Sequence, residues 1–440
     1  MSFCFFVILP ELVCSVLSLI SEPIPNTLVL VFVFIGVCKV ICKIRYDLDS
    51  RSQLLIIAVS ALYDTSLLIG YLTGLQNSIT SLTKDAVCIA IGIIMSWALG
   101  KLLYNEHIKR ISPNILSLLT VGAVLLSCGA VCAAAFIFKV ISNRGDGSVD
   151  IAGTSIQLPE ILKIELVITA YITGLLIRYR RMYIFTFYIS SAAIIIVLAA
   201  ALKEGGTTLL TIYFTLAVSL ILTLSRNTKH SIAFIGAPVP DIIGDIISSP
   251  LVPLLGTVTF FGVLGIVKRV LYTLYPVRGA KGEELYGLGN RAFSISSRLS
   301  ADSAQIERAK DIFDSAPPVQ VNLNNEVCIP NAELKTVLAD YSFVVAGSTL
   351  GRVVAEALFV FAVIALTYAA FRRKEDMLAK ASAVMLLLQA LVHVSGILFS
   401  FCYTGVNFPF LSLGGSSLVS SVTIAGLILI SLRRSSYENT

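Results

Sequence analysis

The sequence predicts an all-α polytopic membrane protein with about twelve transmembrane helices. Hydrophobic residues make up 56% of the 440 positions and charged residues only 14%, which leaves too little polar surface for a soluble protein of this size. A helix needs about 20 mostly apolar residues to cross the hydrocarbon core. Apolar runs of that kind cover about residues 2–20, 26–42, 54–75, 86–103, 113–141, 157–177, 182–202, 207–225, 250–272, 341–371, 379–403 and 415–432.

The basic residues predict the orientation of these helices. Sixteen Lys and Arg residues fall in alternate connections, at 43–51, 101–110, 178–181, 226–229, 372–374 and 433–434, whereas the opposite short connections hold only Lys84, Arg144 and Lys203. Cytoplasmic loops of membrane proteins carry this excess of positive charge, so we expect both termini in the cytoplasm. The same bias accounts for the net charge of +6 without a nucleic-acid partner. The nine cysteines form no CxxC pair, so neither a zinc site nor a disulfide framework is indicated.

Two connections are long, and the one over residues 273–340 is predicted to lie outside the cell. Within it, SADSAQIERAKDIFDSAPP predicts a helix, because Ile306, Ala309 and Phe313 share one face and the paired prolines end the run. A structured outer loop of this length usually has a task.

Several charged residues on the predicted outer side are candidates for chemistry, because ionisable groups at membrane depth are costly. Glu160 and Lys163 share a helix face at i, i+3 and form either a structural ion pair or part of a site. Lys203 and Glu204 begin the turn KEGGTT. Asp340 ends the long loop, where it either caps the following helix or acts as a base. Outer-side cations that either snorkel to headgroups or hold phosphates are Lys268, Arg269 and Arg278.

The stretch YTGVNFPFLSLGGSS, residues 403–417, resembles the PTGLTLPFISYGGSS signature of the SEDS family, the FtsW/RodA/SpoVE proteins. The identities are Thr404, Gly405, Pro409, Phe410, Ser412, Gly414, Gly415, Ser416 and Ser417. Irregular backbone at membrane depth is tolerated where it lines a cavity or is buried in protein. The hairpin is therefore either a wall of a substrate cavity or a cap at the start of the last helix.

Three weaker matches follow in the family's order. IQLPEILKIEL resembles FQPSEFAKLAL at Gln157, Glu160 and Lys163, and LKEGGT resembles QPDLGT with Glu204 at the acidic position. The segment from Pro330 to Gly351 resembles LPEAHTDFIFAVIAEELG and places Asp340 on the family's catalytic aspartate. The resemblance covers about residues 115–434. It implies a ten-helix core over 113–434, which contains the outer loop 273–340, after an N-terminal region 1–112 with two extra helices.

The resemblance implies a peptidoglycan glycan-strand polymerase in the bacterial cytoplasmic membrane. Asp340 would be the catalytic base in an inverting glycosyl transfer from lipid II. The substrate-binding set would comprise Glu160, Lys163, Glu204, Lys268, Arg269, Arg278, Thr404, Gly405, Pro409, Ser412, Gly414, Gly415, Ser416 and Ser417. No tightly held cofactor is implied, and a divalent cation, Mg²⁺ or Mn²⁺, stays open as a further neutralising group. A class B penicillin-binding transpeptidase is the implied partner.

Two other functions stay open. A transporter of lipid-linked oligosaccharides also needs many helices with interior charges. An inactive scaffold for a transpeptidase is the second alternative, because Ser348 and Thr349 stand where the family has paired glutamates and Leu413 replaces the tyrosine of its signature.

Overall fold

The structure is a computed structural model, and it describes most of the chain. The described residues are 32–33, 35–37, 39, 50–73, 79–142, 148–151, 154–202, 204–224, 232–234, 237–239, 304–320, 340–371, 377–398, 405–412 and 414–437. The predicted spans 2–20 and 250–272, and most of 26–42, lie outside these residues.

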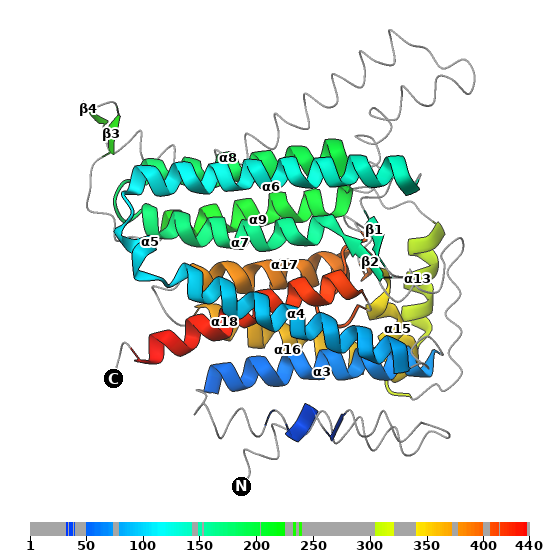
Figure 1. Ribbon diagram of the computed structural model, residues 1–440. Coiled ribbons are helices and arrows are strands. Elements are labelled where there is room, and N and C mark those ends of the chain that lie inside the picture. Colours follow the sequence, from blue (N-terminus) through cyan, green and yellow to red (C-terminus); the bar gives the residue numbers. More distant parts are fainter. Residues whose placement is uncertain are drawn as a thin grey trace. The chain divides into compact units, whose positions relative to one another are not determined.

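Helices dominate the described part, as the sequence predicts (Figure 1). Six of them are long and apolar enough to cross a membrane: Ser50–Leu72, Leu82–Leu103, Pro113–Ile137, Arg352–Ala369, Met377–Leu398 and Gly415–Arg433. Two shorter apolar helices cover Ile184–Ala199 and Gly206–Leu222. The chain is therefore a multi-pass membrane protein, while the total of twelve spans and the side on which the termini lie stay predictions.

The chain forms two compact units, each built from separate segments of the sequence. Unit 1 comprises Met1–Gly100, Ser303–Ser400 and Gly405–Thr440, and unit 2 comprises Lys101–Asp302 and Phe401–Thr404. The division between an N-terminal region 1–112 and a family core 113–434 follows from the family resemblance and stays a prediction.

Unit 1 is a helical bundle. Its described elements are α3 (Ser50–Leu72), α4 (Ile79–Leu103, which runs to the unit boundary), α13 (Ala304–Ser315), α15 (Ser342–Leu350), α16 (Arg352–Phe371), α17 (Met377–Leu398) and α18 (Gly415–Tyr437). Helix α17 packs between α16 and α18, and α3 lies against α15 and α16. Small residues bring α4 and α18 close together, because a β-carbon built on Gly426 would lie 2.4 Å from Ser96 Oγ.

Unit 2 packs four helices around short connections. They are α6 (Pro113–Ser142), α7 (Leu158–Leu176), α8 (Ile184–Ile196) with its π-helical extension η2 (Val197–Leu202), and α9 (Gly205–Leu224). The short elements are α5 (Glu106–Arg110), η1 (Arg181–Tyr183) and two antiparallel hairpins, which pair β1 (Ser148–Ile151) with β2 (Thr154–Gln157) and β3 (Ile232–Phe234) with β4 (Ala237–Val239). Strand β2 runs directly into α7, which carries Glu160 and Lys163.

The predicted single helix over 341–371 is wrong. It is two helices, α15 and α16, which meet at Gly351 with φ +102°. Residues Pro317–Gln320 of the long loop lie against this break. Arg352 N donates to Pro317 O and Val353 N to Pro318 O, both at 3.0 Å, and Gln320 N donates to Leu350 O at 3.2 Å. These bonds satisfy backbone groups that the break takes out of the helical ladder.

The helix predicted within the outer loop is confirmed as α13. Ala309 and Phe313 are buried on its inner face, and it ends at Ser315 before Pro317 and Pro318. Phe313 stacks on Phe343 of α15 with ring centroids 5.1 Å apart. Figure 1 shows α13 beside α15. The middle of the long loop is thereby fixed to the helix that follows Asp340.

Candidate functional site

Asp340 lies against the bend at Gly405, within unit 1. A β-carbon built on Gly405 would lie 3.7 Å from Asp340 Oδ2 and 3.8 Å from its Cγ, which is ordinary van der Waals contact. Gly405 has φ +62°, a conformation that side-chain-bearing residues rarely adopt. Asp340 is partly exposed, whereas the following Tyr341 and Ser342 are buried. The carboxyl group is therefore held at the glycine bend with part of its surface accessible.

Asp340 does not cap α15, which was one of the two roles that the sequence allowed for it. The N-cap of α15 is Tyr341, whose side chain makes no capping hydrogen bond.

Residues Gly405–Ser412 fold into a hairpin with its own hydrogen bonds. Phe408 N donates to Ser412 Oγ at 2.7 Å, and Ser412 N donates back to Phe408 O at 3.0 Å. Ser412 Oγ also lies 3.0 Å from Ser342 Oγ at the start of α15. Phe410 has φ +64°, which is unusual for a residue with a side chain. The predicted site residue Ser412 thus bonds within the hairpin and also links the hairpin to α15.

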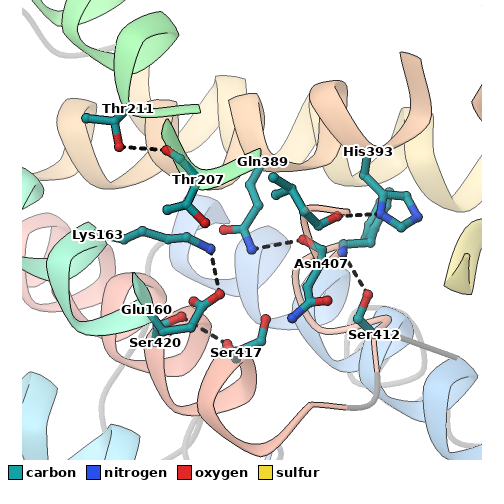
Figure 2. Close-up of polar contacts among 12 residues, drawn as sticks. Glu160, Lys163, Thr207, Thr211, Gln389, His393, Asn407, Ser412, Ser417 and Ser420 are labelled. Carbon is teal, nitrogen blue, oxygen red and sulfur yellow. Dashed lines mark hydrogen bonds and ion pairs between the residues drawn. The ribbon is translucent and has the colours of Figure 1, made fainter. Parts of the chain in front are cut away.

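The rest of the predicted motif begins α18. Leu418 N donates to Gly414 O at 2.8 Å, which starts the helical ladder, and Gly415 is the first helical residue. Ser416 is half-buried, and Ser417 is buried with its carbonyl accepting from Ser420 Oγ at 3.1 Å (Figure 2). Pro409 lines an apolar pocket with Phe408, Phe410 and residues of α3, α16 and α17.

Helix α17 holds the other side of the hairpin through two side chains that the sequence analysis did not select, Gln389 and His393. Gln389 Nε2 donates to Asn407 O at 2.9 Å, and His393 Nδ1 lies 2.7 Å from Val406 O (Figure 2). Polar residues inside a strongly apolar helix were the signal that could have found them.

In unit 2, Glu160 and Lys163 form the predicted pair on α7. Lys163 Nζ lies 2.7 Å from Glu160 Oε1, and the two side chains are only 2% and 6% exposed (Figure 2). The pairing is confirmed, and a role in substrate binding stays a prediction. Breaking a buried pair leaves one uncompensated charge, which costs far more than breaking an exposed pair.

We expect Lys163→Met to destabilise the fold by about 3–5 kcal/mol, because the Glu160 carboxylate would lose its cation while staying buried. Unfolding of the detergent-solubilised chain measures the effect. The double variant Glu160→Gln/Lys163→Met should recover most of the loss. The matched control is Arg110→Met, which breaks an ion pair whose side chains are 74% and 81% exposed and should cost under about 1 kcal/mol. Equal losses for Lys163→Met and Arg110→Met would contradict a special cost at the buried pair.

The remaining predicted residues are only partly described. Glu204 is half-buried before α9, where its carbonyl accepts from Thr208 N at 3.1 Å. Lys268, Arg269, Arg278 and Thr404 lie outside the described residues. Ser348 and Thr349 are buried in α15, where Ser348 Oγ donates to Val345 O at 3.1 Å. The described residues contain no group of three or more His, Cys, Asp or Glu side chains that could hold a metal ion.

Residues 342–437 match the FtsW/RodA/SpoVE family model, described as "Cell cycle protein". No curated protein matches the chain. A solved structure titled "Structural coordination of polymerization and crosslinking by a peptidoglycan synthase complex" is 16% identical, with a TM-score of 0.50 over 87% of this chain and 98% of that chain. This likeness shows a shared fold.

Two structures of the rod shape determining protein RodA of Thermus thermophilus are also similar, at 14% identity and a TM-score of 0.45. One is a point mutant of that protein, and the comparison covers 86% of this chain and 96% of that chain. For the other, it covers 86% and 95%.

Proposed function

We propose that the protein polymerises peptidoglycan glycan strands from lipid II at the outer face of the bacterial cytoplasmic membrane, because residues 342–437 match the FtsW/RodA/SpoVE family model. One observation carries this proposal. The carboxyl group of Asp340 lies beside the glycine bend at Gly405, so two segments that the family resemblance selected lie together in unit 1. The shared fold with the peptidoglycan synthase structure supports the same class of function.

In the proposed reaction, Asp340 is the general base. It accepts the proton of the 4-hydroxyl of one lipid-linked disaccharide while that oxygen attacks the anomeric carbon of a second one. The new bond joins this oxygen to the anomeric carbon, whose bond to the pyrophosphate oxygen breaks with inversion. Proton transfer by a positioned carboxylate typically contributes 10²–10⁴-fold to the rate. The partial exposure of Asp340 and its place beside Gly405, which has no side chain, support this role.

The departing polyprenyl pyrophosphate accumulates negative charge, and we propose basic groups to offset it. Lys163 is one candidate, together with one or more of Lys268, Arg269 and Arg278. The ion pair with Glu160 fixes the Lys163 side chain but also offsets its charge. Lys163 can therefore stabilise the leaving group only if it keeps its ion pair with Glu160 and its ammonium group still approaches a pyrophosphate oxygen. Glu204 and the small residues of the hairpin are proposed contacts for sugar and phosphate groups.

A class B penicillin-binding transpeptidase is the proposed partner. The structure that shares this fold comes from a complex whose title couples polymerisation to crosslinking. A strand made by this chain would need such a crosslinking enzyme beside it. We also propose twelve transmembrane helices with both termini in the cytoplasm. Two of these helices are additional to the family core and precede it.

The experiment that tests the function is polymerisation of lipid II by the purified chain, alone and with a class B transpeptidase from the same organism. We expect glycan polymer, resolved by gel electrophoresis. Absence of polymer while a fluorescent lipid-linked oligosaccharide crosses vesicles would make the chain a transporter. Failure of both assays with retained transpeptidase binding would make it a scaffold, a result that the buried Ser348 and Thr349 in place of glutamates would then explain.

A further inference from the structure

Two buried side chains of α17 hold consecutive carbonyl groups of the hairpin. Gln389 and His393 lie four residues apart on one face of the helix, and they are 0% and 4% exposed. Gln389 Nε2 donates to Asn407 O at 2.9 Å. His393 Nδ1 lies 2.7 Å from Val406 O. Because a carbonyl oxygen can only accept, His393 Nδ1 must carry the proton and donate it.

These two bonds fix the hairpin directly after the bend beside Asp340. Val406 follows Gly405, so the hydrogen bond to the Val406 carbonyl holds the Val406–Asn407 peptide plane, one peptide bond beyond the left-handed glycine. Phe408 adds a third contact, because its ring meets the His393 ring edge-on with centroids 5.5 Å apart. The hairpin therefore cannot shift along α17 without losing both hydrogen bonds and this ring contact.

The opposite side of the hairpin is tied to α15, which begins at Ser342, two residues after Asp340. Ser412 Oγ lies 3.0 Å from Ser342 Oγ, and the Phe408 ring stacks on Phe343 with centroids 6.3 Å apart and planes 8° apart. The hairpin thus bridges α17 and the first turn of α15. A displacement on the α17 side is therefore expected to reach the neighbourhood of Asp340 through this hairpin.

We infer that Gln389 and His393 are positioning residues, which hold the Gly405 bend in its place beside the Asp340 carboxyl group. This role rests on the proposed function, in which the arrangement of bend and carboxyl group defines where the acceptor hydroxyl meets its base. Neither side chain reaches the reacting atoms in this role. They act by fixing the backbone at one place, and displacement of a catalytic group by about 1 Å can cost 10²-fold in rate.

The test compares variants that lose or keep the donor at the same place. His393→Phe keeps a ring but has no donor, and Gln389→Met keeps the length but has no amide. His393→Asn retains a donor close to the position of Nδ1. The matched control is Ser395→Ala on the same helix, because the Ser395 hydroxyl donates to Val392 O of its own helix.

We expect His393→Phe and Gln389→Met to lower kcat for lipid II polymerisation about 10–100-fold with KM changed less than threefold. His393→Asn should recover most of the loss, and Ser395→Ala should match the wild type. A residue that only stabilises the fold would lower the amount of active enzyme without recovery by the asparagine. Unchanged kcat in both donor-free variants of an active enzyme would overturn the inference.

Hydrogen exchange gives a second measurement that does not depend on activity. The Phe408 and Ser412 amides, which bond within the hairpin, should exchange faster in His393→Phe and recover in His393→Asn. If the wild-type chain makes no polymer, the proposed function fails while this exchange result still decides whether the two side chains hold the hairpin. Unchanged protection of both amides in His393→Phe would show that the His393 side chain does not hold the hairpin.

Discussion

Asp340→Asn is expected to lower the rate of glycan polymerisation by about 10²–10⁴-fold, the usual contribution of a general base. Asparagine has nearly the same shape as aspartate, so it can keep the same place beside the Gly405 bend. It cannot take a proton from the attacking hydroxyl. Gel analysis of strands made from lipid II measures the loss, and binding of lipid II should change little.

The matched control for Asp340→Asn is Asp311→Asn. Asp311 is an exposed carboxylate on α13, so the same chemical change is made on the same unit away from the Gly405 bend. Its polymerisation rate should equal that of the wild type. If Asp340→Asn retains more than about a tenth of the wild-type rate, Asp340 is not the base, and the chemistry must be assigned to another group.

The apolar runs of the sequence predicted the helices well because hydrocarbon imposes one condition on every span. A segment without water must satisfy its own backbone, which an unbroken helix does. This condition accounts for α3, α4, α6, α7, α9, α17 and α18, whose bounds fall near the predicted ones. It also explains the error at 341–371, where hydropathy continues without interruption through the break at Gly351.

The break at Gly351 depends on residues that the local sequence does not contain. Pro317, Pro318 and Gln320 come from the outer loop, and their backbone groups replace the bonds that the ladder loses. The candidate site also depends on residues that are distant in the sequence. Local resemblance predicted Asp340 and the hairpin, but the two α17 side chains that hold Val406 and Asn407 became evident only from the fold.

Gly351→Ala is expected to destabilise unit 1 by about 3–5 kcal/mol. The φ of +102° alone costs a side-chain-bearing residue about 1–3 kcal/mol. A β-carbon at this position would also lie 2.5 Å from Val319 Cα and 2.6 Å from Pro318 O, which are backbone atoms. The loop must therefore move away, and each backbone hydrogen bond that it loses costs about 1 kcal/mol more. Unfolding in detergent should show the loss.

Gly129→Ala is the matched control for Gly351→Ala, because nothing lies within 4 Å of a β-carbon built on Gly129 in the middle of α6. Alanine favours a helix over glycine by about 1 kcal/mol, so this variant should be as stable as the wild type or slightly more stable. Limited proteolysis adds a local measurement, since loss of the contact at Gly351 should expose residues 316–320 to cleavage. Equal stability of the Gly351→Ala and Gly129→Ala variants would mean that the outer-loop segment does not hold the break. Asp340 would then owe its place at the Gly405 bend to the hairpin contacts alone.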